Sequence, residues 1–346
     1  MLVLLSRARF VACLWTITLG IAHSTTNLVT QPESVKVFAP ATVANVACGY
    51  DILGFALKQP GDEIVMRKVP EPGVRIVNIS GAEGLPMEPE KNVAGVAVLA
   101  MLADLKSDAG FEIELMKGVK PGSGIGSSAA SSAGAAFAAN QLLGNPYSRS
   151  ELVRFAMEGE KLVSGVAHAD NVAPCLLGGF TLVRSYDPLD IIPIQTPEEL
   201  FCTVIHPQVE VRTADARGIL PEMIDLKVAV KQWGNVAGLV AGLMANDYDL
   251  IGRSMEDVIV EPVRAILIPL CREVKRAALG AGALGASISG SGPSMFALSR
   301  GEETARAVAE AMQAAFEPSG LLNNVHVSAV NPEGVSVVTE ADSAIA

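Results

Sequence analysis

The sequence lacks the features that mark several large classes of protein. Its five cysteines are odd in number and widely spaced, and no two of them form a CxxC pair. This pattern argues against a disulfide framework or a zinc site and favours reduced thiols. Charged residues make up only 18% of the chain, the net charge is −11, and no long run of Lys or Arg occurs. Nucleic acids and anionic membranes need a cationic face, so neither is an expected partner.

The composition is instead that of a folded α/β enzyme. Half of the residues are apolar (50%), and glycine and proline recur along the whole chain. No internal repeat and no low-complexity linker interrupts it. At 346 residues the chain exceeds the usual size of one compact domain, so we expect two lobes or one large α/β unit.

Residues 1–34 differ in character from the rest of the chain. Arg7 and Arg9 precede an apolar run over residues 10–22, which resembles the start of a secretory signal but is too short for a membrane span. Three interpretations stay open: a signal peptide, an organellar presequence, or residues upstream of the true start. Reduced cysteines favour a cytoplasmic protein, with an organellar or exported location only if this segment is a genuine targeting signal.

From Val35 onward, short β-branched runs alternate with longer helical ones, which predicts an α/β or α+β protein. The pattern predicts strands at 35–39, 51–57, 63–69, 74–79, 111–117, 180–184, 202–206, 286–289 and 325–329. Apolar residues at helical spacing predict helices at 92–105, 149–164, 223–245, 262–279 and 302–316. We expect the first strand to run into a proline-containing loop, the last to close the fold, and any two lobes to be interleaved or divided near residue 185.

The most informative segment is a glycine-rich stretch between a predicted strand and a helix of small residues, Pro121-Gly122-Ser123-Gly124-Ile125-Gly126-Ser127-Ser128. Glycine allows positive φ angles and a close approach of the backbone to a ligand. Ser127 and Ser128 stand where the helix begins, so free amides and the positive end of the helix dipole converge there. Such a place binds anions, and a polyphosphate fits it. Taken alone, about half of such loops are only tight turns with a helix cap.

Two common nucleotide motifs do not fit this stretch. A P-loop needs a lysine after its last glycine, and a dinucleotide fingerprint needs G-x-G-x-x-G, whereas here no lysine follows Gly126 and the glycines alternate. The pattern P-x-x-G-[LI]-G-S-S-A does match, and it resembles the central motif of the GHMP kinases. The resemblance implies an α+β fold with an N-terminal lobe like domain 2 of ribosomal protein S5, containing a left-handed β-α-β unit, and a ferredoxin-like C-terminal lobe.

Two more segments resemble motifs of this superfamily. Residues 35–51, VKVFAPATVANVACGYD, resemble its N-terminal motif, and residues 288–294, ISGSGPS, resemble its third motif, a glycine loop that returns to the phosphates. The resemblance therefore extends from residue 35 to about residue 300. It implies a leader or extension at 1–34, an ATP-binding N-terminal domain at 35–185 and a C-terminal domain at 186–340.

The residues between these motifs resemble those of homoserine kinases. They are Glu160, the run HADNVAP at 168–174, the run RTADAR at 212–217 with Leu220-Pro221, and EPVR at 261–264. The resemblance implies transfer of the γ-phosphoryl group of ATP to the side-chain hydroxyl of L-homoserine, a step of threonine biosynthesis. It also implies Mg²⁺ bound with ATP, and a homodimer.

The chemistry of such a reaction asks for these residue types. Mg²⁺ keeps several waters, so the Ser128 hydroxyl and the Glu160 carboxylate suffice as metal ligands. Acids can hold the substrate ammonium, and arginines can clamp its carboxylate. The predicted substrate-binding residues are Asn45, Asp51, His168, Asp170, Thr213, Arg217, Arg264 and Gly290. The predicted ATP-binding residues are Asn92, near the base, and the loop residues Pro121, Gly122, Ser123, Gly124, Ile125, Gly126, Ser127 and Ser128.

The predicted catalytic residues are Asp170, Asn45 and Arg217. Asp170 is the one candidate base, and direct transfer of the hydroxyl proton to the γ-phosphate is the alternative. Taken singly, His168 indicates a structural histidine and Arg264 a surface ion pair, and only their joint occurrence favours a site. Two rival functions stay open: a kinase for another small alcohol of the mevalonate type, and a catalytically inactive sensor.

Overall fold

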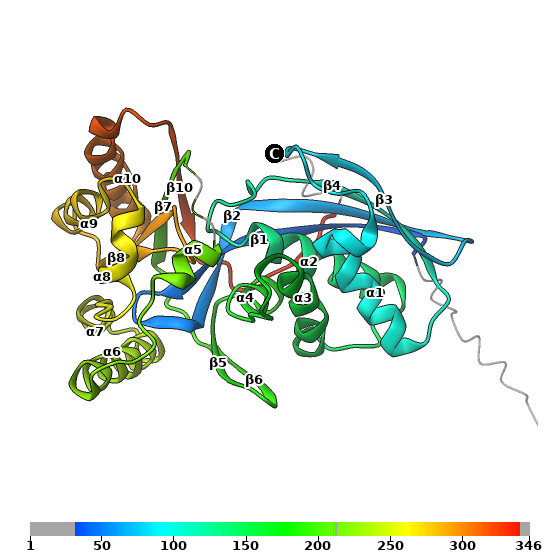
Figure 1. The fold of residues 1–346 in the computed structure, drawn as a ribbon, viewed down its shortest axis with the longest axis horizontal. Coiled ribbons are helices and arrows are strands. Elements are labelled where there is room, and N and C mark those ends of the chain that lie inside the picture. Colours follow the sequence, from blue (N-terminus) through cyan, green and yellow to red (C-terminus); the bar gives the residue numbers. More distant parts are fainter. Residues whose placement is uncertain (1–31, 210, 212, 340–346) are drawn as a thin grey trace, which may run out of the picture. The chain divides into compact units, whose positions relative to one another are not determined.

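Two long antiparallel strands, β1 (Ser34–Val46) and β2 (Gly49–Val69), form the centre of the larger of two β-sheets (Figure 1). The computed structural model describes residues 32–209, 211 and 213–339, so most of the predicted leader lies outside the described residues. The larger sheet has the order β11-β1-β2-β4-β3, and the hairpin β5-β6 joins it through β2. Its other strands are β3 (Gly73–Ser80), β4 (Gly110–Met116), β5 (Phe180–Tyr186), β6 (Leu189–Ile194) and β11 (Ser336–Val337).

Helices from the first half of the chain cover one face of this sheet. Their apolar side chains share one buried cluster with those of β1, β2, β3 and β4, including Ile64, Met66 and Phe111. The covering helices are α1 (Val93–Leu105), α2 (Ser127–Leu142), α3 (Arg149–Ser164) and α4 (Val172–Leu177), with a short 3₁₀ helix η1 (Pro89–Lys91) before α1. The glycine-rich stretch lies between β4 and α2, at the end of this layer.

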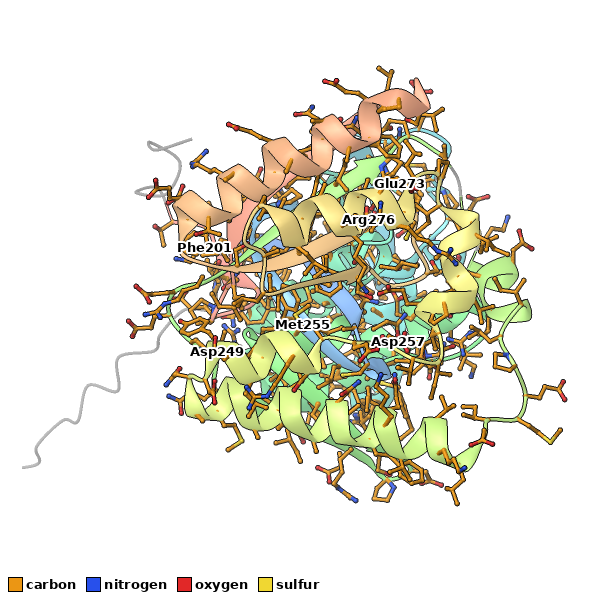
Figure 2. All side chains as sticks on the ribbon, turned by 90° about the vertical axis from the view of Figure 1, so that its left-hand side faces the viewer. Phe201, Asp249, Met255, Asp257, Glu273 and Arg276 are labelled. Carbon is orange, nitrogen blue, oxygen red and sulfur yellow. The ribbon has the colours of Figure 1, made fainter. Side chains whose placement is uncertain are left out.

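The smaller sheet has the order β10-β7-β9-β8 and is covered on both faces (Figures 1 and 2). Side chains alternate between the faces of a strand. Accordingly, Ile205 and Met295 pack with α9 and α10, whereas Val204 and Phe296 pack with α6 and α7. The strands are β7 (Leu200–Pro207), β8 (Gly285–Ile288), β9 (Met295–Arg300) and β10 (Asn323–Ala329). The helices are α5 (Thr213–Gly218), α6 (Leu226–Ala245), α7 (Tyr248–Ser254), α8 (Glu261–Arg264), η2 (Ala265–Leu267), α9 (Cys271–Gly280), α10 (Glu302–Phe316) and η3 (Glu317–Ser319).

Small residues on α2 allow the helix to pack closely against the larger sheet. Nearly all residues of α2 are buried, and except for Phe137, Asn140 and Leu142 the buried ones are Ala, Ser or Gly. A Cβ on Gly134 would stand 2.4 Å from Ile64 Cδ1 and 2.8 Å from the Ala39 Cβ, distances that no real side chain tolerates. The composition of α2 therefore sets how near its N-terminus comes to β1 and β2, and so positions the glycine-rich stretch.

Most predicted elements are confirmed, and two helices have the predicted bounds, 149–164 and 302–316. The helix α3 begins with a capping box in which Ser148 and Glu151 satisfy each other's backbone amides. The prediction that the first strand ends before Pro40 is wrong, because β1 continues through it to Val46 with a register shift beside the proline. The strand 325–329 does not close the fold, since β11 follows it and pairs with β1.

The single helix predicted at 262–279 is also wrong, because the structure divides it into α8, η2 and α9. Pro269 explains the break. A proline disfavours the helical conformation of the residue before it, and Ile268 has the extended angles φ −116° and ψ 117°. Leu270 then adopts a left-handed conformation, from which α9 starts in a new direction.

The division into lobes at residue 185 stays a prediction. The strand β6, which follows that residue, pairs with β5 and so belongs to the larger sheet. The chain enters the smaller sheet at Leu200. Within the described part of the chain, no helix is both long enough and apolar enough to cross a membrane.

Candidate active site

The glycine-rich stretch leaves the start of α2 open to solvent. Gly124 and Gly126 have φ angles of 79° and 70°, in the region that favours glycine, and Gly126 is the N-cap of α2. No side chain caps this helix. The first amides of a helix have no partner within it, so those of Ser127 and Ser128 are available to an anion.

The first and third motifs hold this stretch from two sides. The Thr42 amide donates to the Ile125 carbonyl at 3.1 Å, and a Cβ on Gly126 would stand 2.0 Å from Thr42 Oγ1. On the other side, Ser289 and Ser294 donate from their hydroxyls to the carbonyls of Gly124 and Ser123, at 2.7 and 2.6 Å. The carbonyls of the stretch are therefore bound to protein, and the three motifs meet in one place.

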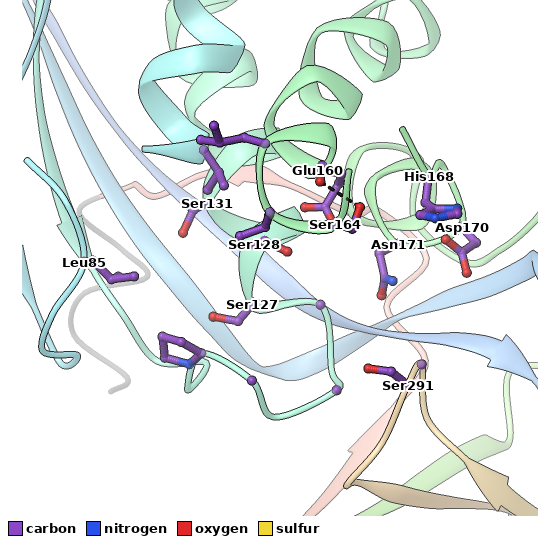
Figure 3. A pocket seen from close by; sticks show the side chains of 18 of the residues that line it. Leu85, Ser127, Ser128, Ser131, Glu160, Ser164, His168, Asp170, Asn171 and Ser291 are labelled. Atoms are coloured by element: carbon purple, nitrogen blue, oxygen red, sulfur yellow. Dashed lines mark hydrogen bonds between the residues drawn. The ribbon is translucent and has the colours of Figure 1, made fainter. Parts of the chain in front are cut away.

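A cleft of about 740 Å³ opens along the start of α2. Figure 3 shows Leu85 at one end, Ser128 and Glu160 in the middle, and His168 and Asp170 at the other end. Of the predicted site residues, the following line the cleft: Asn45, Asp51, Asn92, Pro121, Gly122, Gly124, Gly126, Ser127, Ser128, Glu160, His168, Asp170, Arg217, Arg264 and Gly290. Ser123 and Ile125 are buried and are not among the lining residues, and the Thr213 side chain lies outside what the structure describes.

Glu160, on α3, places a buried carboxylate in the middle of the cleft. Burial raises its pKa to about 7, and a hydrogen bond from the Ser128 hydroxyl and the charge of Lys117 act in the opposite direction. Its Oε1 atom is buried and has no hydrogen-bond partner. A buried carboxylate oxygen without a partner is costly, and a cation would satisfy it. In the described residues, no group of three or more His, Cys, Asp or Glu could hold a metal.

Asp51 and Arg217 form an ion pair at the far end of the cleft. Two guanidinium nitrogens of Arg217 donate to the two carboxylate oxygens of Asp51, each at 3.2 Å. His168 Nε2 lies 2.9 Å from Arg217 Nη2. Arginine only donates, so Nε2 accepts and the proton of the neutral ring is on Nδ1, which faces Asp51 Oδ1 at 3.8 Å. Burial lowers the pKa of His168, which agrees with the neutral form.

Tyr50 lies close to both arginines that line the cleft. Its ring centroid lies 5.7 Å from the Cζ atom of Arg217 and 5.0 Å from that of Arg264. Arg264 is buried, and it donates from Nε to the Ala216 carbonyl at 2.9 Å and from Nη1 to the Gly290 carbonyl at 3.1 Å. Protein groups therefore hold both arginines in position. The sequence prediction missed Tyr50, although it stands next to Asp51 in the first motif.

Asp170 is buried beside this pair. Burial, with the charges of Asp51 and Glu160, raises its pKa to about 7. The backbone also fits closely here, because a Cβ on Gly54 would stand 1.8 Å from the Asp170 carbonyl oxygen. Tyr186 links the backbone segments on either side of this site. Its hydroxyl donates to the Asp51 carbonyl at 2.9 Å and accepts from the Ala169 amide at 3.3 Å.

Two predicted side chains have structural partners. The Asn45 amide group donates to the Gly290 carbonyl at 2.8 Å and accepts from the Asp51 amide at 2.8 Å, so it joins the first and third motifs. Asn92 is the N-cap of α1: its oxygen accepts from the Ala94 amide at 3.0 Å, and its nitrogen donates to the Pro86 carbonyl at 2.8 Å. Both side chains therefore shape the cleft that they line.

Family comparisons agree with this arrangement. Residues 92–179 match the family described as GHMP kinases N terminal domain, and residues 239–318 match GHMP kinases C terminal. A homoserine kinase of Chlorobium phaeobacteroides (strain BS1) is 50% identical over 319 residues, which cover 88% of this chain and 100% of that protein. The chain belongs to the homoserine kinase family of the GHMP kinases.

Solved structures support the same assignment. The crystal structure of homoserine kinase from Cytophaga hutchinsonii ATCC 33406 matches with a TM-score of 0.86 and 56% identity, over 89% of this chain and 98% of that one. The crystal structure of L. major mevalonate kinase in complex with R-mevalonate matches with a TM-score of 0.67 at 18% identity, over 85% and 96% of the two chains, and so shares the fold. The predicted GHMP kinase fold and the resemblance to homoserine kinases are confirmed.

The structure of this member of the homoserine kinase family also contains a buried ion pair behind the start of α2, which the sequence did not predict. Lys117, after β4, forms an ion pair with Asp62 of β2, and their side chains are 2% and 1% exposed. Lys117 Nζ also donates to the Ser127 carbonyl and the Ser131 hydroxyl, both at 2.8 Å. Burial lowers the pKa of Lys117, and Asp62 counteracts this shift. The pair therefore anchors the first turn of α2 to the sheet.

Asp62 accepts four hydrogen bonds in this cluster. Its Oδ1 atom accepts from the amides of Gly118 and Val119 at 3.1 and 3.0 Å, and its Oδ2 atom accepts from the Ser131 hydroxyl at 2.9 Å and from Lys117. Both charges are thus fully satisfied. Removal of one partner would leave the other as an uncompensated buried charge.

We predict that Lys117→Met lowers the free energy of unfolding by about 3–5 kcal/mol, the usual loss when one partner of a buried pair is removed. It should also raise the KM for ATP, because the first turn of α2 loses its anchor. Urea unfolding and steady-state kinetics check both effects.

The double variant Lys117→Met/Asp62→Asn should recover part of the stability, since Asn keeps an acceptor for the amides without a buried charge. Arg306→Met, which breaks an exposed pair on α10, is the control and should change stability by less than about 1 kcal/mol. A Lys117→Met variant with normal stability and a normal KM for ATP contradicts the anchoring role.

We also predict that burial of Asp170 makes stability depend on pH. Its pKa of about 7 in the folded chain lies above the ordinary value of ~3.9, so the stability present below pH ~4 is lost as the pH rises to about 7. Asp170→Asn removes this loss. Relative to the wild type, the variant should therefore gain stability between pH 5 and 7, by up to ~1.4 kcal/mol per pH unit, and no more above pH 7.5.

Urea unfolding without ligands at pH 5, 6, 7 and 8 measures this gain. The same substitution at the exposed Asp249 controls for the general effect of removing one negative charge. A constant stability difference between Asp170→Asn and the wild type across this range would show that Asp170 is ionised throughout.

Proposed function

We propose that this chain transfers the γ-phosphoryl group of ATP to the side-chain hydroxyl of L-homoserine, giving O-phospho-L-homoserine for threonine biosynthesis. One observation carries the proposal: the Asp51–Arg217 pair lies in the same cleft as the open N-terminus of α2. An amino acid carries one ammonium and one carboxylate. Its ammonium can bind Asp51 and its carboxylate can bind Arg217, so each partner of the pair gains a new contact in place of the old one. Family membership supports the same substrate.

We infer that the triphosphate of ATP binds along the glycine-rich stretch. The amides at the start of α2 would donate to phosphate oxygens, and their dipole would offset part of the phosphate charge. The base would then extend toward Leu85, Asn92 and Val163, where the cleft is more apolar. The reacting phosphate would face Asp170 and Arg217 at the opposite end.

The donors present fit Mg²⁺. The carboxylate of Glu160, with one oxygen lacking a partner, and the hydroxyl of Ser128 would hold the ion, and phosphate oxygens and waters would complete its coordination. When bound, the ion neutralises charge on the phosphate oxygens. The positions of Ser128 and Glu160 are set by α2 and α3, so the protein supplies these ligands from rigid elements.

Asp170 would accept a hydrogen bond from the substrate hydroxyl and orient it toward the γ-phosphate. Two routes for its proton follow from this geometry, one to the Asp170 carboxylate and one to the phosphoryl oxygen. A pKa of about 7 suits a group that takes a proton near neutral pH. Positioning accounts for more of the rate than a strong base in either route, because phosphoryl transfer has a loose transition state. Arg217 would stabilise charge on the transferred group or clamp the substrate carboxylate.

We further propose a homodimer in the cytoplasm. The dimer is an expectation from the family. Four free cysteines, Cys48, Cys175, Cys202 and Cys271, are buried, which suits a reducing compartment.

We predict that the purified full-length chain releases ADP from ATP in the presence of L-homoserine and not of mevalonate. The specificity constants should differ by a factor on the order of 10⁴, because a substrate without an ammonium leaves Asp51 without a replacement contact. A coupled ADP assay over a panel of hydroxyl-bearing metabolites measures this ratio. Equal turnover with mevalonate favours the rival kinase, and no turnover with any member favours the inactive sensor.

We predict opposite effects of Glu160→Gln on activity and stability. Turnover should fall by roughly 100-fold or more, since the neutral amide is a poor ligand for Mg²⁺. Stability at pH 8 should rise, because the ionised buried carboxylate is gone. Steady-state assays over a range of Mg²⁺ concentrations and urea unfolding test the two effects.

Glu158→Gln, an exposed position on the same helix, is the matched control and should change neither property. Normal turnover of Glu160→Gln at low Mg²⁺ removes Glu160 from the metal site.

A further inference from the structure

Gln232 is a buried polar side chain on a helix face that is otherwise apolar. The other buried residues of α6 are Leu239, Gly242 and Leu243, whereas Gln232 is only 6% exposed. Burial of an amide is costly unless its donors and its acceptor find partners. The hydrogen bonds of Gln232 therefore show which parts of the chain this residue holds together.

The Gln232 side chain joins two segments that are far apart in the sequence. Its nitrogen donates to the Cys48 carbonyl, in the turn between β1 and β2, and to Asp257 Oδ1, in the loop between α7 and α8, both at 2.9 Å. Its oxygen accepts from the Val258 amide at 3.0 Å. Because the nitrogen meets two acceptors and the oxygen meets a donor, the amide has one satisfied orientation.

Asp257, labelled in Figure 2, organises the backbone that leads into α8. It is 7% exposed. Besides the bond from Gln232, its carboxylate accepts from the backbone amides of three residues at 2.8–3.0 Å: Ile259, Val260 and Glu261. The helix α8 has only four residues and ends at Arg264. A helix this short has little stability of its own, so its position depends on these contacts.

The turn on the other side of Gln232 has a strained backbone. Asn45, Ala47 and Asp51 have φ angles of 54°, 48° and 58°, in the left-handed region that is unfavourable for residues with a Cβ. Such conformations persist only where the surrounding structure holds them. The Asn45 side chain supports the turn from within, and Gln232 supports it from outside through Cys48. Loss of the Gln232 bonds should therefore loosen the segment that carries Asp51.

The two segments that Gln232 joins meet again at the substrate end of the cleft. The Gly290 carbonyl accepts from the Asn45 side chain at 2.8 Å and from Arg264 Nη1 at 3.1 Å. Tyr50, at the start of β2, has its ring centroid 5.0 Å from the Arg264 Cζ atom. Gln232 itself is not among the residues that line the cleft. It therefore acts on the cleft only through the segments that it binds.

We propose that Gln232 and Asp257 are positioning residues that fix the distance between Asp51 and Arg264. This proposal rests on the proposed function, in which Asp51 binds the substrate ammonium and Arg264 is one of the arginines that bind its carboxylate. Both charged groups of an α-amino acid are attached to one carbon, so their partners must keep a matched separation. The hydrogen bonds of Gln232 and Asp257 end on the turn or on residues 258–261, away from the glycine-rich stretch.

The variant Gln232→Met tests this role by steady-state kinetics of the full-length chain. Methionine has nearly the length of glutamine and makes none of its three hydrogen bonds. The kcat/KM for L-homoserine should fall by roughly 10- to 100-fold, the usual effect of a displaced binding group, mainly through a higher KM. The KM for ATP should change by less than about twofold, because the glycine-rich stretch keeps its contacts.

Thr203→Val is the matched control. Thr203 is fully buried on β7 and donates to the Ala305 carbonyl at 2.8 Å, so this variant also loses a buried hydrogen bond of the smaller sheet. It should unfold at a lower urea concentration and keep the wild-type KM for both substrates. A Gln232→Met variant with wild-type kcat/KM for homoserine, or with equally raised KM values for both substrates, overturns the proposal.

Substitutions of Asp257 should give a graded effect. Asp257→Asn keeps one oxygen as an acceptor, whereas Asp257→Ala keeps none, so the KM for homoserine should rise more in the alanine variant. In Gln232→Met/Asp257→Ala the combined rise should be smaller than the product of the two single rises, because both residues act on the same segment. Effects that multiply in full would show that the two residues act separately, and would overturn their joint role.

Hydrogen exchange of the ligand-free chain tests the link without any substrate. In Gln232→Met, the amides of residues 45–51 and 257–264 should exchange faster than in the wild type, and those of residues 121–128 should not. Mass spectrometry of peptides measures this difference. Unchanged exchange in both segments, or equally faster exchange everywhere, overturns the proposal. If the two segments respond as expected but the wild type does not turn over homoserine, the proposed function fails, and with it the role toward the substrate, whereas the link between the segments stands.

Discussion

The open N-terminus of α2 is the constraint on which the rest of the site depends. An uncapped helix end needs partners for its amides, and here the nearby backbone carbonyls are bound to other protein groups. Thr42, Ser289 and Ser294 bind the carbonyls of the glycine-rich stretch, and the Ser127 hydroxyl donates to the Val119 carbonyl at 2.7 Å. The amides then face the cleft, where an anion can bind them.

Keeping that end open places several charges in the protein interior. Lys117 and Asp62 satisfy each other behind the helix, whereas Glu160 and Asp170 in front of it have no such counter-ion. Burial raises the pKa of both acids to about 7, so their ionised forms destabilise the ligand-free fold. A divalent cation beside Glu160 and a substrate ammonium near Asp170 would lower the free-energy cost of the two ionised carboxylates. Binding energy and stability are thus linked through the same two carboxylates.

The sequence predicted the motifs, most elements and the residues that line the cleft, because these depend on local patterns. It did not predict which charged side chains form ion pairs with one another. Asp51 and Arg217 are 166 residues apart, and Lys117 and Asp62 are 55 apart, so no local pattern connects them. The link from Asn45 to Gly290 was hidden for the same reason, whereas the cap that Asn92 forms on α1 is a local feature. By contrast, the break in the helix predicted at 262–279 has a local signal, Pro269.

The Asp51–Arg217 pair also explains how the cleft can discriminate among small alcohols. Separation of a partly buried ion pair is unfavourable unless each partner gains an equivalent contact. A zwitterion supplies both contacts at once, whereas an acid without an ammonium supplies one and leaves Asp51 beside Asp170, a second carboxylate. Like charges in a desolvated site repel, so such a ligand raises the free energy of the acids that it fails to cover. Selectivity would then come mainly from the repulsion between the Asp51 and Asp170 carboxylates when a substrate lacks an ammonium, and less from the shape of the cleft.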